Sequence, residues 1–145
     1  MIKIICVGKI KENYLKDLIE DYTKRINKYH KLEIIEVKDE DSEYKEQENI
    51  LKVITPKDYI ITLEIEGNTY TSEEFSEHID KLFLKTNNIT FIIGSSLGLS
   101  DAIKKLAKES ISFSKLTFPH GLFRGILLEQ IYRSFKILNH ETYHK

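Results

Sequence analysis

Short, strongly apolar runs recur along the chain, and helical periodicity follows each of them. The runs are Ile2–Val7, Leu32–Val37 and residues 59–65, 89–93 and 111–116. The first is almost free of polar side chains, which is typical of a strand buried on both faces of a sheet. Parallel strands need long crossover connections, usually helices. The alternation therefore predicts an α/β fold, a parallel-sheet α/β sandwich of about five strands.

The segments between the runs predict helices. Leu15, Leu18, Tyr22 and Ile26 recur at intervals of three or four residues and predict an amphipathic helix. Residues 36–48 are rich in acids and are expected to begin as an exposed loop, followed by a helix that stops before Pro56.

Three further boundaries are predicted from turn and capping residues. The sequence 66–68 (EGN) predicts a turn that closes the third strand. Thr71 with Glu74 forms a capping box that opens the next helix. Ser100 is the expected N-cap of a short helix running to about residue 108, and Pro119 the expected first position of the final helix.

Length and composition predict one soluble domain spanning residues 1–145, because the chain shows no repeat, low-complexity segment or linker. Cys6 is the only cysteine, so an internal disulfide and a cysteine-based zinc site are excluded and a reducing, cytoplasmic location is expected. No His, Asp or Glu spacing indicates a metal site, and no apolar run approaches the roughly 20 residues needed to span a bilayer.

Charge is distributed unevenly along the chain. Residues 1–100 carry 14 Lys and Arg against 19 Asp and Glu, whereas residues 101–145 carry 8 against 4. A basic end on an acidic chain is compatible with a polyanion-facing surface, although charged runs are more often simply solvated.

Ligands of open parallel sheets bind at the carboxyl ends of strands, which directs attention to residues 64–67, 94–99 and 115–120. Two loops at these strand ends are candidate ligand sites. The loop 94–98 (GSSLG) offers glycines and hydroxyls, but it lacks the terminal Gly-Lys-Ser/Thr of a phosphate loop and the spacing of a dinucleotide fingerprint. Residues 113–120 alternate apolar side chains with small hydroxyls, which suits an adenine or thioether pocket. An ordinary strand-to-helix turn and a half-buried strand are the competing interpretations.

The final helix and tail carry the remaining candidates. Arg124 and Arg133 are spaced to contact separate phosphates, and an ion pair with Glu129 or surface solvation is the alternative for each. In the tail, Tyr143 is suited to stacking on a splayed base and His144 to moving a proton near neutral pH.

Taken together, these segments resemble the RlmH type of SPOUT methyltransferase, the pseudouridine-1915 N3-methyltransferases of 23S rRNA. The resemblance extends over almost the whole length in ordered segments: residues 2–9 (IKIICVGK), 62–67 (TLEIEG), 91–94 (FIIG), 112–120 (SFSKLTFPH), 128–133 (LEQIYR) and the terminal 143–145 (YHK).

The resemblance implies features that general rules of chain topology would exclude, above all a C-terminal trefoil knot that forms the cofactor pocket. It implies S-adenosyl-L-methionine as cofactor, a homodimer with an active site completed across the interface, and 23S rRNA within the assembled ribosome as substrate. The implied cofactor contacts fall on Leu63, Gly94, Phe113, Ser114, Lys115, Leu116, Thr117 and Phe118.

The chain departs from the family pattern at two places. Family members usually have two adjacent glycines where this chain has Gly94 and Ser95. If the second position needs a positive φ, serine there costs on the order of 1 kcal/mol and weakens cofactor binding. Gly121 and Gly125 in the final helix either loosen it by up to roughly 1 kcal/mol each or permit close packing against a partner.

The resulting hypothesis is methyl transfer to N3 of the pseudouridine, with alignment of nitrogen, methyl and sulfur as the main task. His144 is the candidate base, Tyr143 holds the target base, and Arg124 stabilises the developing anion; Arg124, Arg133 and Lys145 are the expected RNA contacts. Two alternatives remain: a catalytically silent ribosome- or RNA-binding protein of the same fold, supported by Ser95, and a generic nucleotide-binding α/β protein.

Overall fold

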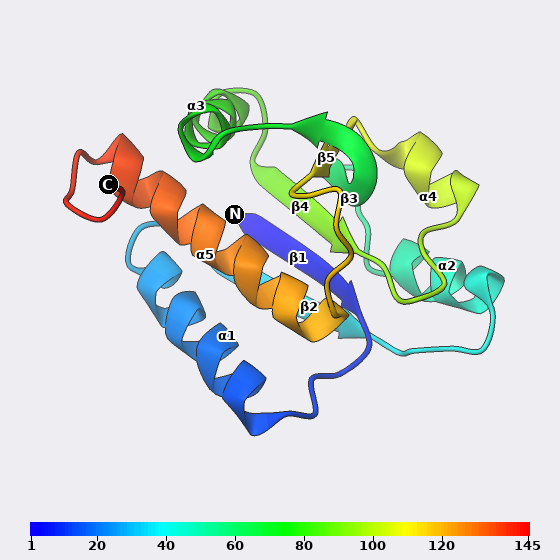
Figure 1. The fold of residues 1–145 in the computed structure, drawn as a ribbon. Coiled ribbons are helices and arrows are strands. Elements are labelled where there is room, and N and C mark those ends of the chain that lie inside the picture. The colour runs from blue at the N-terminus through cyan, green and yellow to red at the C-terminus, as the bar shows by residue number, and fades with distance from the viewer.

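Five parallel strands form one sheet in the computed structural model, which describes residues 1–145 (Figure 1). The sheet order is β2-β1-β4-β3-β5. The strands are β1 (Ile2–Val7), β2 (Leu32–Val37), β3 (Asp58–Thr69), β4 (Asn88–Ile93) and β5 (Glu109–Ser112). All four neighbouring pairs are parallel, so the predicted parallel α/β sandwich is confirmed.

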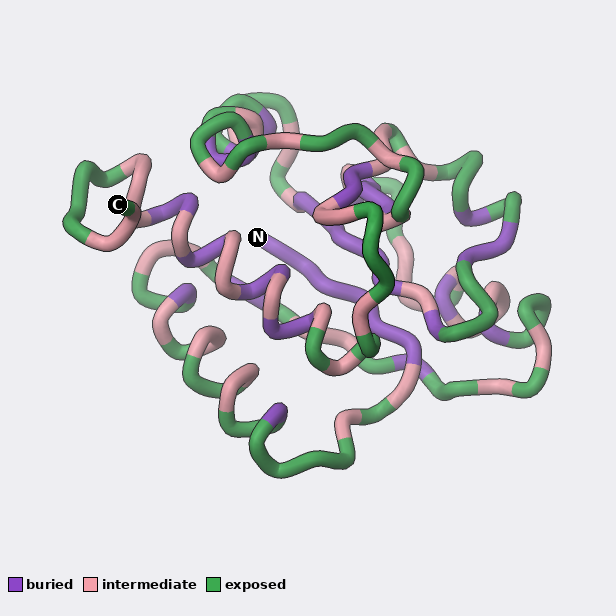
Figure 2. Tube along the Cα trace, in the orientation of Figure 1, coloured by how far each residue is buried: buried purple, intermediate pink, exposed green.

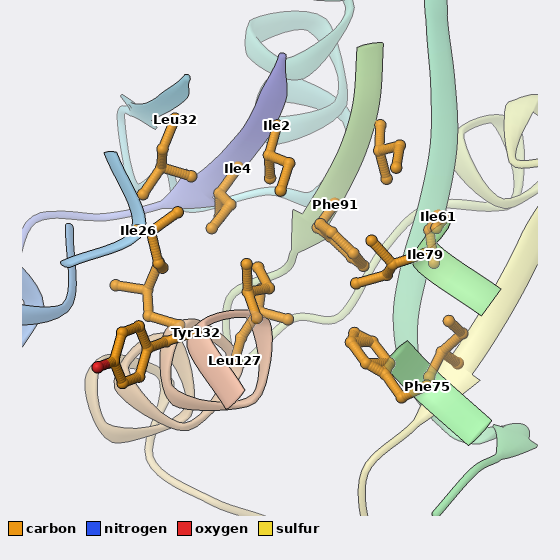
Figure 3. Close-up of a cluster of buried hydrophobic side chains, with 14 of the residues drawn as sticks. Ile2, Ile4, Ile26, Leu32, Ile61, Phe75, Ile79, Phe91, Leu127 and Tyr132 are labelled. Carbon is orange, nitrogen blue, oxygen red and sulfur yellow. The ribbon is translucent and has the colours of Figure 1, made fainter. Parts of the chain in front are cut away.

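Helices cover both faces of the sheet. The helices are α1 (Asn13–Asn27), α2 (Glu43–Leu51), α3 (Ser72–Phe83), α4 (Asp101–Leu106) and α5 (His120–Leu138). Ile2 and Ile4 of β1 pack in the larger core with side chains of α1, α3 and α5 (Figure 3). Ile5 and Val7 point the other way, into a smaller core shared with α2 and α4. β1 is buried throughout, as Figure 2 shows, because alternate side chains enter the two cores.

Cys6 is buried within the larger core, where burial raises the pKa of its thiol to about 12 and keeps it protonated. None of the five helices is both long enough and apolar enough to cross a bilayer.

Local capping agrees with the sequence at most helix starts. Both arms of the predicted capping box between Thr71 and Glu74 are formed, and Ser100 caps α4 by accepting from the Ile103 amide. Pro119 is the N-cap of α5 rather than its first residue, and α4 ends at Leu106. The acidic stretch was expected to begin as a loop; its second half forms α2, capped by Ser42.

The prediction of a turn at residues 66–68 is wrong, because β3 continues through them to Thr69. The strand bends into an arch over residues 64–67, and Leu63 and Asn68 on either side of it both register with Ile111 of β5. Gly67 allows this close crossing: a Cβ at Gly67 would lie 2.7 Å from a backbone atom of Ser110.

The prediction of a strand over 111–116 is also wrong in its second half. β5 begins earlier, at Glu109, and ends at Ser112. Ser112 Oγ donates to the Ser114 carbonyl (3.1 Å), and Ser114 Oγ accepts from the Leu116 amide (2.9 Å). These local bonds replace strand pairing and turn the chain out of the sheet toward α5.

Candidate functional site

A cavity of about 290 Å³ opens at the carboxyl ends of β3, β4 and β5. This is the edge at which open parallel sheets bind ligands. Its walls come from the arch of β3, the loop after β4, α4, and the segment that joins β5 to α5. The lining residues are Leu63, Glu64, Ile65, Glu66, Ile93, Gly94, Ser95, Gly98, Leu99, Lys104, Ile111, Phe113, Ser114, Leu116, Thr117, Phe118, His120 and Phe123.

Seven of the eight residues expected to contact a cofactor lie in this lining. They are Leu63, Gly94, Phe113, Ser114, Leu116, Thr117 and Phe118. Lys115 does not line the cavity, and its side chain is exposed to solvent. The two loops that the sequence marked as candidates thus meet around a single cavity, although they lie about 20 residues apart in the chain.

Aromatic rings form much of one wall. Phe113 meets Phe123 edge to face at 5.4 Å between ring centroids, and Phe118 stacks on Phe123 at 6.1 Å. Phe113 also meets Phe75 of α3 edge to face, which ties this wall to the larger core. Flat aromatic faces beside an irregular segment suit a planar heterocycle.

Gly94 is the first residue after β4, and its lack of a side chain lets the loop pack closely against Leu99 and Gly98 at the edge of the cavity. A Cβ there would lie 3.1 Å from Leu99 and 3.2 Å from the backbone of Gly98. The loop closes as a turn in which the Gly98 amide donates to the Ser95 carbonyl (2.9 Å), and Gly98 has φ +76°.

The strain expected at Ser95 is absent. The only non-glycine residue with positive φ is His140, so Ser95 has a conformation that serine adopts without penalty. Ser95 is buried, and its hydroxyl donates to Glu46 Oε1 (2.6 Å) and accepts from the Leu97 amide (3.1 Å). Glu46 is itself buried on α2 and accepts from the Glu40 amide through Oε2. The Ser95 hydroxyl therefore links the cavity loop to α2 through its hydrogen bond to Glu46.

Glu64 begins one of the three strand-end segments to which the sequence drew attention, but no role was predicted for its side chain. Its Oε2 accepts from Thr62 Oγ1 and Ser110 Oγ, each at 2.8 Å, and its Oε1 lies 3.2 Å from Lys104 Nζ. Burial alone would raise the pKa of Glu64, but the bonds from Ser110, Thr62 and Lys104 hold it below its ordinary value. The sequence carries one signal for a functional role of Glu64, because it is an acidic residue at the end of a strand that is otherwise largely apolar.

Arg124 is buried rather than exposed, with 3% of its surface accessible. It pairs with Glu36 of β2 (2.6 Å) and donates to the Gly8 carbonyl (3.1 Å). The alternative ion pair with Glu129 is wrong for Arg124, whose partner is Glu36, and is confirmed for Arg133. Arg124 therefore joins α5 to the carboxyl ends of β1 and β2, and reaching a phosphate would require breaking this pair.

The C-terminal tail is docked on α3 and α5 by its polar side chains. Arg133 donates to Glu129 through Nε (3.0 Å) and Nη2 (2.5 Å), and its Nη1 contacts His144 Nδ1 (3.0 Å). His144 Nε2 lies 2.6 Å from Glu73 Oε1 at the start of α3. Tyr143 donates to Glu129 Oε1 (3.2 Å) under the Arg133 guanidinium.

These contacts bring Tyr143 and His144 of the tail together with Arg133 of α5. Burial raises the pKa of Tyr143, with further contributions from Tyr22 and Glu129, so its phenol stays protonated. Lys145 follows them and is exposed.

The tail does not line the cavity of its own chain. The cavity lies at the His120 end of α5, a helix of 19 residues and thus roughly 28 Å long. The tail follows the opposite end of that helix (Figure 1). The structure therefore brings the predicted cofactor residues together and the predicted tail residues together, but as two separate groups.

Comparison with solved structures gives the same architecture. A probable methylase family protein from Haemophilus influenzae aligns over 99% of this chain and 70% of its own length, with a TM-score of 0.58 at 14% identity. The SpoU methyltransferase AviRb from Streptomyces viridochromogenes, solved in complex with AdoMet, aligns over 92% of this chain and 57% of its own, with a TM-score of 0.51 at 12% identity.

Sequence relatives are much closer. The ribosomal RNA large subunit methyltransferase H of Caldicellulosiruptor saccharolyticus is 50% identical over the full length of both chains. The protein of the same name from Clostridium acetobutylicum is 47% identical over 99% of each chain. The family model described as "Predicted SPOUT methyltransferase" matches residues 1–144. With its five-stranded parallel sheet, and with the C-terminal knot that this fold implies, the chain belongs to the SPOUT methyltransferase family.

Proposed function

We propose that this protein methylates large-subunit ribosomal RNA, using S-adenosyl-L-methionine, at N3 of a pseudouridine in the 23S rRNA of the assembled ribosome. The observation that carries the proposal is the cavity, in which Leu63, Gly94 and the segment from Phe113 to Phe118 converge. The names of the full-length relatives support the rRNA substrate. Such a substrate also supports a cytoplasmic location, and one sheet with a core on each face supports action as one domain.

The residues present fit the cofactor. The aromatic wall of Phe113, Phe118 and Phe123 suits an adenine ring, and Gly94 lets the loop after β4 pack tightly at the cavity edge. When bound, S-adenosylmethionine supplies a methyl group that its sulfonium already activates. The remaining task of the protein is to orient the acceptor nitrogen, exclude water and accommodate the N3 proton.

We propose that the protein is a homodimer in which the tail of one copy serves the cavity of the other. This follows from the separation of the two groups of candidate residues within one chain. His144 remains the proposed base and Tyr143 the residue that holds the target base, while Arg133 and Lys145 contact RNA. Arg124, buried against Glu36, acts by holding the Gly8 loop and α5 together rather than by touching RNA.

The test is transfer of a tritiated methyl group from S-adenosylmethionine into intact ribosomes, separated subunits and naked 23S rRNA. We expect incorporation into intact ribosomes at a single pseudouridine. After deletion of residues 143–145, incorporation should fall by roughly 100-fold or more, the contribution of one general acid–base group. Incorporation that does not depend on these residues would refute the role of the tail. No incorporation into any substrate, with no thermal stabilisation by the cofactor, would instead favour a silent binding protein.

A further inference from the structure

The cavity contains one ion pair formed between two of its own lining residues, Glu64 and Lys104. Most of the remaining wall is apolar or uncharged. The pair lies where the arch of β3 faces α4, and both side chains are partly exposed, 21% for Glu64 and 44% for Lys104. The cavity thus offers a ligand a positive and a negative group about 3 Å apart, next to an aromatic wall.

The two members of the pair are held very differently. The Glu64 carboxylate accepts two hydroxyl hydrogen bonds, from Thr62 and Ser110, in addition to the contact with Lys104. A carboxylate has about four acceptor sites, so one remains for a ligand. Lys104 Nζ has Glu64 as its only partner, so two of its three donors are free. Glu64 is fixed, and the Lys104 ammonium can turn toward a ligand without leaving Glu64 unsupported.

We propose, on the basis of the proposed function, that this pair binds the amino-acid end of S-adenosylmethionine, with Lys104 on its carboxylate and Glu64 on its α-ammonium. The cofactor carries one zwitterion, and the Glu64–Lys104 pair presents the complementary arrangement of charge. The aromatic wall accepts the adenine end, so the two ends of the cofactor are recognised by different chemistry. Both residues bind the cofactor directly, and neither has a part in proton transfer.

Isothermal titration of the full chain with three ligands tests this assignment. S-Adenosylmethionine and S-adenosylhomocysteine share the amino-acid end, whereas 5′-methylthioadenosine lacks it but keeps the adenosine. We expect Lys104→Met to raise the Kd for the first two ligands roughly tenfold, the loss of about one charge-assisted hydrogen bond, and to leave 5′-methylthioadenosine unchanged. Glu64→Gln, which keeps the shape and its hydroxyl neighbours, should show the same selectivity.

Exposed residues provide matched controls. Lys105→Met removes an exposed ammonium from the same helix, and Glu77→Gln removes an exposed carboxylate of α3 that does not line the cavity. Neither control should change the Kd for any of the three ligands. Thermal melts without ligand verify that each variant is folded.

The outcomes separate the two levels of proposal. If Lys104→Met weakens 5′-methylthioadenosine as much as S-adenosylmethionine, or weakens neither, the assignment of the pair is overturned and the proposed function stands. If Lys105→Met or Glu77→Gln has the larger effect on the amino-acid ligands, the assignment is again overturned. If the wild-type chain binds none of the three ligands, the proposed function itself fails.

Discussion

At the scale of single residues, Ser95 illustrates how one hydroxyl can replace a glycine without strain. Its φ is not positive, and its side chain connects the cavity loop to the buried Glu46 of α2. The sequence argument for a silent protein depended on strain at this residue. Because the strain is absent, that alternative loses its support.

We therefore expect Ser95→Gly, which restores the glycine pair typical of the family, to destabilise the protein. The free energy of unfolding should fall by roughly 1–3 kcal/mol, because the buried Glu46 carboxylate loses a donor. The affinity for S-adenosylmethionine should not increase. Urea denaturation and ligand titration measure both, with Ser96→Gly in the exposed part of the same loop as control. A more stable Ser95→Gly protein would contradict the role given to the hydroxyl.

A second residue-scale feature lies at the opposite end of the sheet. Asp58 pairs with Lys3 (3.0 Å), and it accepts from the Thr55 amide and from Asn88. Burial alone would raise the pKa of Asp58, but the bonds from Thr55, Lys3 and Asn88 hold it below its ordinary value. A depressed carboxyl pKa contributes stability that is complete above the unfolded pKa and is lost as pH falls through the folded one.

We expect Asp58→Asn to lower the free energy of unfolding by roughly 3 kcal/mol at neutral pH, because Lys3 stays buried without its counter-ion. The loss relative to wild type should shrink as pH falls below about 4, where Asp58 of the unfolded chain binds a proton, and it should disappear below the depressed pKa of the folded state. Urea denaturation across this range measures the difference, with the exposed Asp41→Asn as control. A difference that does not change with pH would show that the charge of Asp58 is not what stabilises the fold.

At the scale of elements, glycines set how closely segments approach. The arch of β3 crosses β5 with Gly67 against backbone, whereas Gly121 and Gly125 of α5 face side chains of α1 and its preceding loop. A Cβ at Gly125 would lie 2.6 Å from Leu18 Cδ2. The helix glycines thus permit close α1–α5 packing within one chain, rather than only against a partner.

The two kinds of contact predict opposite tolerance to alanine. Gly67→Ala should cost more than about 3 kcal/mol and weaken cofactor binding, because backbone atoms of Ser110 and Ile111 cannot move aside. Gly121→Ala should cost less than about 1 kcal/mol, because the ends of Leu15 and Ile10 can rotate and alanine favours the helix. Chemical denaturation and cofactor titration compare the pair. Equal costs would argue against the arch as a rigid crossing.

At the scale of the whole molecule, the cavity and the tail lie at opposite ends of α5. One chain therefore holds both groups of residues without joining them. Symmetric pairing of two copies is the simplest way to place a tail at a cavity, since each copy then completes the other.

Mixed dimers test this arrangement. A dimer of a Gly94→Leu subunit and a subunit lacking residues 143–145 has one open cavity and one tail, on different chains. A dimer of wild type with a doubly altered subunit has both on the same chain. If the tail acts across the interface, the first should retain about half of the wild-type methylation rate and the second almost none. The reverse result would show that each tail serves its own chain.

Much of this protein follows from its sequence through local physical rules. Alternate burial fixed β1 as a strand that enters two cores, and hydroxyl caps at Thr71 and Ser100 fixed where helices begin. The two loops around Gly94 and Phe113 could be marked because strand ends of parallel sheets meet at one edge. The family resemblance then supplied a knotted fold that no local rule predicts.

The tertiary structure decided what depends on neighbours distant in the chain. Glu66 and Gly67 form an arch rather than a turn because β3 crosses β5 at this point. β5 follows more than 40 residues later in the chain, so local sequence does not reveal the crossing. Whether Arg124 is free or buried depended on Glu36 of β2, and the function of Ser95 depended on Glu46 of α2. Local composition encodes propensity and periodicity, but an ion pair or a close backbone crossing exists only once folding brings its two halves together.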